Sequence, residues 1–106
     1  MKVTMTNHAK EERMNRLTYI AMTIGFGEVV FERIEDDRRY CITDSGVLMV
    51  KALKEEVLIT AYIVTIDKAI ALYRNEMGHD QRMPNKLYDT IRRNAHHAKM
   101  QNKVVF

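Results

Sequence analysis

Cysteine, proline and glycine are scarce in this sequence, and tryptophan is missing. The 106 residues include one cysteine, Cys41, one proline, Pro84, and four glycines. A single cysteine excludes an intramolecular disulfide and any CxxC metal or redox motif. It also fits a reducing compartment, so we expect a cytoplasmic protein.

Long apolar runs are missing as well. No window approaches the roughly 20 apolar residues that a membrane span requires. The first 17 residues, MKVTMTNHAKEERMNRL, carry charge where a signal peptide needs an apolar core. We therefore expect no membrane partner. The length predicts a single domain over residues 1–106, and a hydrophobic fraction of 46% is typical of a globular protein with one core.

The net charge of +3 is unevenly distributed along the chain. Residues 1–17 carry +2, residues 82–106 carry +5, and the segment between them carries −4. A basic C-terminal segment suits a polyanion such as RNA or DNA, or an acidic protein surface. The simpler interpretation is a solvated helix face. The candidate binding residues of this segment are Lys86, Arg92, Arg93, His96, His97 and Lys99.

Residues 7–24 follow a helical period, as one long helix or two short ones. Met14, Leu17, Ala21 and Ile24 form the predicted apolar stripe. Thr6 or Asn7 can cap its start, and Gly25 and Gly27 are expected to end it. Four methionines also stand at predicted core positions; they are Met14, Met22, Met49 and Met77.

From Glu28 the period changes to two, which predicts four strands over residues 29–34, 38–43, 46–53 and 55–65. Their connections are too short for anything but antiparallel neighbours, so we expect a four-stranded meander. Both faces of the last strand are largely apolar, which favours a central strand or one covered on both sides.

Two further helices follow the predicted strands. Thr65 or Asp67 can cap the first, whose apolar stripe contains Ile66, Ile70, Tyr73 and Met77 and which ends at Gly78. Pro84 suits the entrance of the last helix, from about Asn85 to Met100. That helix has a narrow apolar seam made of Leu87, Ile91, Ala95 and Ala98. The expected fold class is α+β: an N-terminal helix, a four-stranded antiparallel meander and two C-terminal helices.

Motifs for cofactors and metals are not found. Gly25-Phe26-Gly27 ends a helix instead of opening one, which argues against a Gly-rich phosphate loop. His96 and His97 are adjacent, so they lie about 100° apart on a helix, and no HxxxH or HExxH spacing exists. We expect no metal and no cofactor. Cys41 lies in a strand and is expected to be a small core residue.

Cleavage of RNA without a metal remains compatible with the sequence. It requires activation of the 2′-hydroxyl, stabilisation of the phosphorane and protonation of the leaving oxygen. His8 and Arg13 on the first helix, with Thr60 and Tyr62 on one face of the last strand, could supply these groups. Arg38 or Arg39 could add a phosphate contact. The alternative is that Thr60 and Tyr62 are ordinary strand formers and that His8 is exposed at a helix start.

The stretches NHAKEERMNR and VLITAYIVT together resemble a family pattern. They look like DUF4258-type proteins and, more broadly, the barnase-, EndoU-, colicin- and RelE-like ribonuclease domains. Those families open with a His-Ala-x-x-Arg-Met-like helix and carry a Thr-x-Tyr-like element on a late strand. The resemblance covers about residues 7–65. It implies a phage- or toxin-type endoribonuclease in which His8, Arg13, Thr60 and Tyr62 are catalytic.

One departure from that pattern concerns the first helix. The family pattern places the arginine four residues after the histidine, whereas Arg13 comes five after His8. Five residues swing a helical side chain about 140° away, so Glu12 shares the face of His8 instead.

Two other functions fit the same residues. The chain could be a non-catalytic phage-type inhibitor or regulator that binds RNA, or an acidic or nucleic-acid-binding protein, through its basic C-terminal helix. It could also be a homo-oligomer whose Leu87, Ile91, Ala95 and Ala98 seam docks against another copy.

Overall fold

The computed structural model describes the backbone of residues 7–55 and 57–106, and the side chains from residue 11 on. Helix α1 (Asn7–Tyr19) continues as a π-helical turn, η1 (Ile20–Ile24). Four strands follow: β1 (Val29–Glu35), β2 (Arg38–Thr43), β3 (Val47–Ala52) and β4 (Leu58–Ile63). Helices α2 (Ile66–Met77) and α3 (Asn85–Met100) complete the chain. The predicted α+β fold is confirmed.

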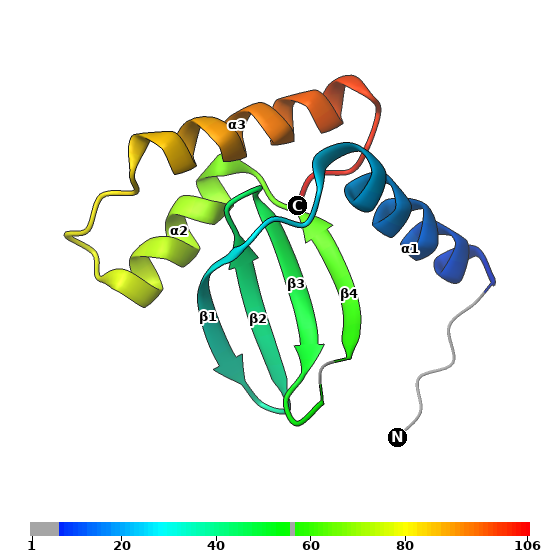
Figure 1. Cartoon of the computed structure of the whole chain (residues 1–106), viewed down its shortest axis with the longest axis horizontal. Helices are drawn as coiled ribbons and strands as arrows, with labels where there is room; N and C mark the ends of the chain where they lie inside the picture. The colour runs from blue at the N-terminus through cyan, green and yellow to red at the C-terminus, as the bar shows by residue number, and fades with distance from the viewer. Residues whose placement is uncertain (1–6, 56) are drawn as a thin grey trace.

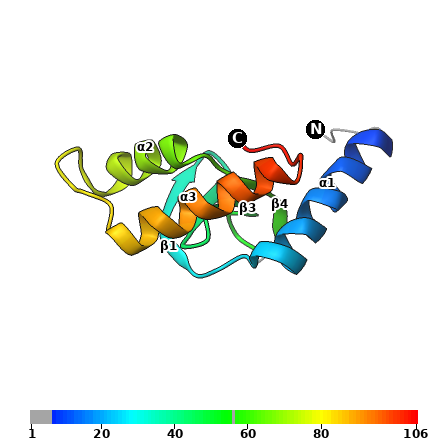
Figure 2. The ribbon, with the colours of Figure 1, turned by 90° about the horizontal axis from the view of Figure 1, so that it is seen from above.

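The strands form one antiparallel sheet in the order β1-β2-β3-β4, so the predicted meander is confirmed. Helix α3 crosses the upper ends of the strands, α2 lies beside it, and α1 runs along the β4 side (Figure 1). Seen from above, α1 and α2 lie toward opposite ends of α3 (Figure 2). The helices are therefore gathered at one end and one side of the sheet.

Strand β4 is an edge strand, so the first of the two predicted alternatives, a central strand, was wrong. Thr60, Ala61 and Ile63 are nevertheless buried, whereas Val57 and Leu58 are exposed. Helix α1 packs on this side of the sheet, with Ile20 in one core cluster with Ala61 and Ile63. The apolar character of both faces thus reflects helical cover over the second half of the strand, not a position between two other strands.

The apolar seam of α3 is buried within the chain's own core. Ala98 belongs to a cluster with Ile20, Val47 and Ile63, and Ile91 belongs to a second cluster with Val64. Because this seam already faces the sheet, it is not available as the docking strip for another copy that the sequence suggested.

Helix α3 approaches the turn between β2 and β3 closely. The Asn94 side-chain amide donates a hydrogen bond of 3.0 Å to the Ser45 carbonyl. Gly46 adopts φ +83°, and a Cβ added there would lie 2.9 Å from the Cγ2 of Ile91. Glycine is required at this position by both the backbone conformation and the proximity of α3.

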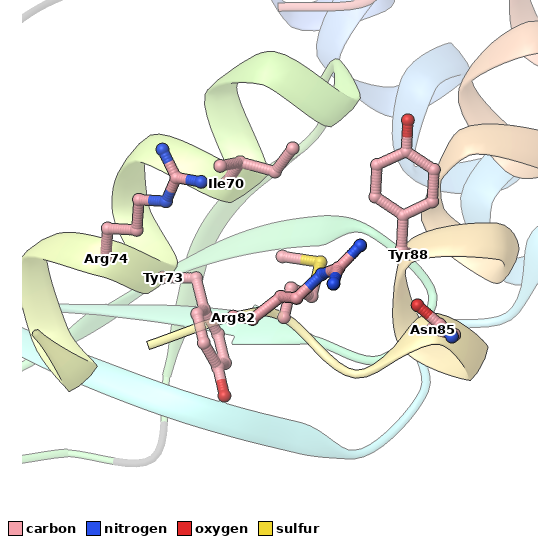
Figure 3. A pocket seen from close by; sticks show the side chains of 7 residues that line it. Ile70, Tyr73, Arg74, Arg82, Asn85 and Tyr88 are labelled. Carbon is pink, nitrogen blue, oxygen red and sulfur yellow. The ribbon is translucent and has the colours of Figure 1, made fainter. Parts of the chain in front are cut away.

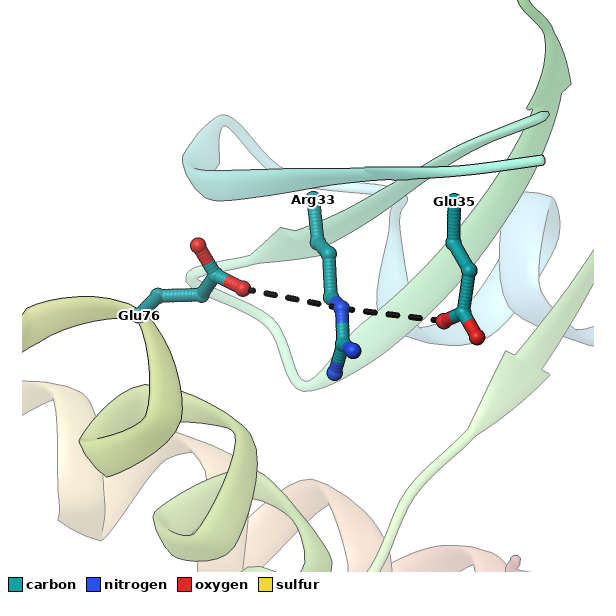
Figure 4. A network of polar contacts seen from close by, with 3 residues as sticks. All are labelled: Arg33, Glu35 and Glu76. Atoms are coloured by element: carbon teal, nitrogen blue, oxygen red, sulfur yellow. Dashed lines mark ion pairs between the residues drawn. The ribbon is translucent and has the colours of Figure 1, made fainter. Parts of the chain in front are cut away.

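Helix α2 is held against β1 by one aromatic and one ionic contact. The rings of Phe31 and Tyr73 meet edge to face, with 5.7 Å between centroids. Arg33 lies between Glu35 at 3.6 Å and Glu76 of α2 at 4.0 Å (Figure 4). These ion pairs are substantially exposed and contribute little, so the aromatic contact is the stronger attachment.

The predicted core positions of three methionines were wrong. Met14, Met22 and Met77 are 57%, 81% and 44% exposed, and Met49 is buried as predicted. Of the predicted stripe, Leu17 and Ile24 pack against the core cluster that contains Ile20, whereas Met14 and Ala21 face solvent. The turn η1, closed by a bond from Gly25 N–H to the Ile20 carbonyl, also departs from the 3.6-residue period on which the prediction rested.

The caps of the helices agree with the prediction where they are described. Thr65 caps α2, because its hydroxyl accepts a hydrogen bond of 3.2 Å from the Lys68 N–H. Gly25 ends η1 with φ +80°, a conformation that L side chains rarely adopt, so the predicted stop at this glycine is confirmed. The predicted cap at Thr6 lies outside the described residues, and Asn7 is the first residue of α1.

Candidate functional site

Arg16 of α1 joins the two residues that the sequence selected on β4. Its Nε donates a hydrogen bond of 2.8 Å to the Ala61 carbonyl, and its second guanidinium nitrogen donates one of 3.0 Å to the Thr60 hydroxyl. The guanidinium carbon also lies 4.5 Å from the centre of the Tyr62 ring. Thr60 and Tyr62 are therefore brought together with an arginine of the first helix, as expected, but that arginine is Arg16.

The position of β4 at the sheet edge explains why this side chain is needed. An edge strand presents carbonyl and N–H groups that no neighbouring strand satisfies. Arg16 occupies the Ala61 carbonyl. Further along the strand, Phe106 donates to the Ile63 carbonyl and accepts from the Thr65 N–H, both at 2.8 Å. The outer edge of β4 is thus covered by one side chain and by the last residue of the chain.

Aromatic rings hold the Arg16 guanidinium from two directions. Tyr62 and Phe106 pack edge to face with centroids 4.7 Å apart, and Arg16 lies 5.9 Å from the Phe106 ring. A cation over aromatic faces is stabilised most when it is partly desolvated, as it is here. The ring contacts therefore fix the direction in which the remaining N–H groups of Arg16 point.

A cleft opens beside Arg16 and is lined by residues of α1 and of the segment that follows α3. Its volume is about 250 Å³. Two cationic side chains line it, together with two amides, a carboxylate and a phenol; they are Arg16, Lys103, Asn15, Asn102, Glu12 and Tyr19. The rest of the lining is apolar and comes from Ile63, Val104 and Phe106. The cationic and amide donors suit a small anion such as a phosphate group.

Tyr19 gives this cleft an unusual polar group. Its hydroxyl is buried and has no hydrogen-bond partner within the part of the chain that the structure describes. The Lys103 ammonium lies 5.2 Å from the Tyr19 ring centre. Buried hydroxyls are nearly always hydrogen-bonded, so the Tyr19 hydroxyl is an exception within the described structure.

The other catalytic candidates of the first helix are not all placed at the cleft. Glu12 lines the cleft, and Arg13 is half-buried on α1 but is not among the residues that line it. The His8 side chain lies outside the described residues, although its backbone forms the first turn of α1. Glu12 and Arg16 follow His8 at successive four-residue steps, so all three positions share one helix face.

Sequence reasoning missed Arg16 for an identifiable reason. The search for an arginine near His8 considered one turn of helix, where the family pattern has it. Arg16 lies two turns on, at the four-residue step that also contains Glu12 and the buried Ile20. The available signal was the four-residue spacing of His8, Glu12 and Arg16 along one helix face.

Arg38 and Arg39 belong to a different part of the molecule. They begin β2, at the end of the sheet away from α3 (Figure 1). The Arg39 guanidinium donates to the carbonyls of Ala52 and Glu55, both at 3.4 Å. These arginines do not extend the basic surface of α3, and Arg39 supports the connection between β3 and β4.

Cys41 is a buried core residue, as predicted. Burial raises its pKa above the ordinary value of 9.0, and a hydrogen bond of 3.5 Å from its thiol to the Glu32 carboxylate raises it further. A thiol with a raised pKa holds little thiolate near neutral pH, so it is a poor nucleophile.

The candidate binding residues of α3 lie together on its outer face. Ile91, Ala95 and Ala98 are buried on the inner face. The candidates are all exposed; they are Lys86, Arg92, Arg93, His96, His97 and Lys99. The helix has 16 residues, which makes it about 24 Å long. This outer face of α3, with its six candidates, is called the basic face below.

Two surveys of the described residues complete the description of the site. No group of three or more His, Cys, Asp or Glu side chains there could hold a metal ion. No helix among residues 7–55 and 57–106 is long and apolar enough to cross a membrane.

Comparison with known proteins identifies no relative: no family model, curated protein or solved structure matches this chain.

Proposed function

We propose that the protein is an RNA-directed domain that binds the phosphate backbone along the basic face of α3. The observation that carries this proposal is the division of α3 into two faces. Ile91, Ala95 and Ala98 are buried in the core, while the cations of the helix are all exposed to solvent. Asp89 is the one acidic residue of α3, so the net charge of the helix is strongly positive.

The geometry of the basic face suits a chain of phosphates. Its length of about 24 Å spans several nucleotides of a single strand. Arginine can donate to two phosphate oxygens at once, and lysine supplies a mobile point charge. Binding of this kind releases counterions and therefore weakens as salt rises.

The basic face also leads to the cleft. Helix α3 ends at Met100, and Asn102 and Lys103, which follow it, line the cleft beside Arg16. A strand held along α3 would reach Lys103 at its end. The two cationic regions therefore support a single path for a polyanion.

Charge reversal on α3 tests the proposal. Binding of a labelled single-stranded RNA of about ten nucleotides is measured by fluorescence anisotropy for the wild type and for Arg92→Glu/Arg93→Glu/Lys99→Glu. The matched control is Arg38→Glu/Lys54→Glu/Lys68→Glu, which makes the same change in net charge at exposed positions outside α3. We expect the α3 variant to bind at least about tenfold more weakly than the control. Equal losses in both variants, or no binding by the wild type, would overturn the proposal.

A second function, cleavage of the bound RNA without a metal, is favoured by the groups gathered in the cleft. Arg16 and Lys103 would hold the scissile phosphate, and Glu12 or His8 would take the proton of the 2′-hydroxyl. Whichever of the Glu12 and His8 side chains is protonated would donate a proton to the leaving oxygen. Thr60 and Tyr62 would position Arg16. The resemblance to RelE- and barnase-like ribonucleases predicts this activity as well.

A further inference from the structure

A second pocket lies between α2 and α3, and it shares no lining residue with the cleft beside Arg16. Its volume is about 390 Å³. Arg74 comes from α2, Arg82 from the loop between the helices, and Asn85 and Tyr88 from the start of α3 (Figure 3). This volume is within the roughly 300–1,000 Å³ range of small-molecule sites.

Two arginines line the pocket without a negative partner. Arg74 and Arg82 are both exposed, and neither makes a side-chain hydrogen bond or ion pair within the described part of the chain. No carboxylate is among the lining residues. Two arginines that line one pocket favour an anion that can accept several hydrogen bonds, and phosphate is such an anion.

Two aromatic rings and an apolar floor lie beside these charges. Tyr73 is held in place by its edge-to-face contact with Phe31, and Tyr88 packs against the second core cluster. Met83, only 7% exposed, forms part of the floor. Tyrosine rings fixed in this way offer a surface on which a planar base can stack.

Asn85 adds a group that can recognise the edge of such a base. Its side-chain amide has one acceptor and two donor hydrogens, and Figure 3 shows it on the α3 side of the pocket, near the Tyr88 backbone. No side-chain hydrogen bond of Asn85 is found in the described structure. An amide can pair with the mixed donor and acceptor edge of a nucleobase.

We propose that this pocket binds a nucleoside monophosphate group. Arg74 and Arg82 hold the phosphate, Tyr73 or Tyr88 stacks on the base, and Asn85 pairs with the base edge. The side chains hold the phosphate here, without a Gly-rich loop. The same chemistry could come from a free nucleotide or from one nucleotide of an RNA strand. The inference does not depend on RNA binding along α3.

Titration of the full chain with AMP tests the proposal. Binding is monitored through the backbone amide resonances of Asn85 and Tyr88 in NMR spectra. We expect saturable shifts at these amides. Inorganic phosphate and adenosine, each of which supplies half of the group, should bind at least about tenfold more weakly than AMP. Equal binding of inorganic phosphate and AMP, or no saturable shift with AMP, would overturn the proposal.

A double variant separates this pocket from the rest of the basic surface. Arg74→Gln/Arg82→Gln should weaken AMP binding at least about tenfold. The control Arg92→Gln/Arg93→Gln removes two exposed arginines of α3 that do not line the pocket, and it should leave AMP binding within about twofold. Equal effects of the two double variants would show that AMP responds to general charge, and would contradict the assignment.

A 5′-phosphorylated RNA of five nucleotides distinguishes the two sources of the group. Displacement of AMP by this RNA in the wild type supports a nucleotide within a strand, and retention of AMP supports a free nucleotide. The two proposals also fail separately. Loss of RNA binding along α3 leaves the AMP titration unchanged, whereas failure of the AMP titration leaves the anisotropy result unchanged.

Discussion

Arg16 and Thr60 lie 44 residues apart in the sequence and are joined by a hydrogen bond of 3.0 Å. This bond, with the bond from Arg16 to the Ala61 carbonyl, ties α1 to the outer edge of β4. The same arginine lines the cleft. One side chain therefore serves both the packing of the first helix and the cleft in which we place the candidate chemistry.

Replacement of Arg16 should destabilise the fold. Arg16→Ala removes two hydrogen bonds and the ring contact of a half-buried cation, and we expect a loss of about 2–3 kcal/mol in the free energy of unfolding. Arg16→Lys keeps the charge but loses the fork geometry, so it should also destabilise. Urea unfolding measures both. The control is Arg92→Ala, an exposed arginine of α3, for which a change below about 0.5 kcal/mol is expected. If Arg16→Ala is as mild as the control, the hydrogen bonds do not hold α1 on β4.

Gly46 should tolerate alanine less well than Gly25 does. The two positions have nearly the same φ, +83° and +80°. A Cβ at Gly46 would meet Ile91, whereas one at Gly25 would meet nothing within 4 Å. We expect Gly25→Ala to cost about 1–3 kcal/mol from backbone strain alone and the contact with Ile91 to add about 1–3 kcal/mol in Gly46→Ala. Thermal or urea unfolding of the two variants measures the difference. Equal costs would mean that α3 does not pack closely on the turn between β2 and β3.

The raised pKa of Cys41 predicts a loss of stability at alkaline pH. Burial and the Glu32 carboxylate favour the neutral thiol in the folded chain, so its pKa lies above the ordinary value of 9.0. The unfolded chain then releases this proton at lower pH than the folded chain does. The contribution of the neutral Cys41 thiol to the free energy of unfolding is therefore complete below pH 9.0. It is lost as pH rises from there through the pKa of Cys41 in the folded chain.

The difference between the wild type and Cys41→Ala isolates this effect, because other titrating groups are common to both proteins. We expect the stability advantage of the wild type over Cys41→Ala to shrink as pH rises past about 9. A difference that stays constant through this range would contradict the raised pKa.

Cleavage of RNA in the presence of EDTA separates the two proposed functions. If the cleft is catalytic, labelled RNA is cut by the wild type, and Lys103→Gln and Glu12→Gln slow the reaction by about 10²–10⁴-fold. His8→Ala tests the remaining base candidate, and Tyr62→Phe tests the Thr-x-Tyr element. Cleavage that is unchanged in every one of these variants rejects the cleft as the active centre. If the wild type binds RNA through α3 but does not cleave it, only the binding function is supported, as expected for a non-catalytic regulator.

Most of the fold followed from local patterns. Residues 38–43 alternate clearly and form β2 with the predicted bounds, and α3 begins after Pro84 and ends at Met100 as predicted. The short connections determine the meander because two or three residues can join only adjacent antiparallel strands. These features depend on neighbours in the sequence, and that is why they could be read from it.

What the sequence did not reveal depends on contacts between distant segments. The sequence of β4 has the same apolar pattern whether its faces are covered by other strands or by α1 and the end of the chain, so the pattern does not distinguish the two. Met14 has the right spacing for a core residue, but its helix turns Ile20 toward the sheet instead. Arg16 was missed because its partners, Thr60 and Ala61, lie more than 40 residues away. Thr60 and Tyr62 were selected correctly as neighbours of an arginine, and their catalytic role stays a prediction.

The salt dependence of RNA binding tests the central claim most directly. The basic face has four permanent cations, Lys86, Arg92, Arg93 and Lys99. Four phosphate contacts to a single strand predict a slope of about −3 in a plot of log K against log salt concentration, measured between about 50 and 200 mM. Arg92→Glu/Arg93→Glu/Lys99→Glu should abolish most of that slope together with the affinity. A wild-type slope shallower than about −1, or a slope that the variant leaves unchanged, would show that α3 does not hold the phosphate backbone.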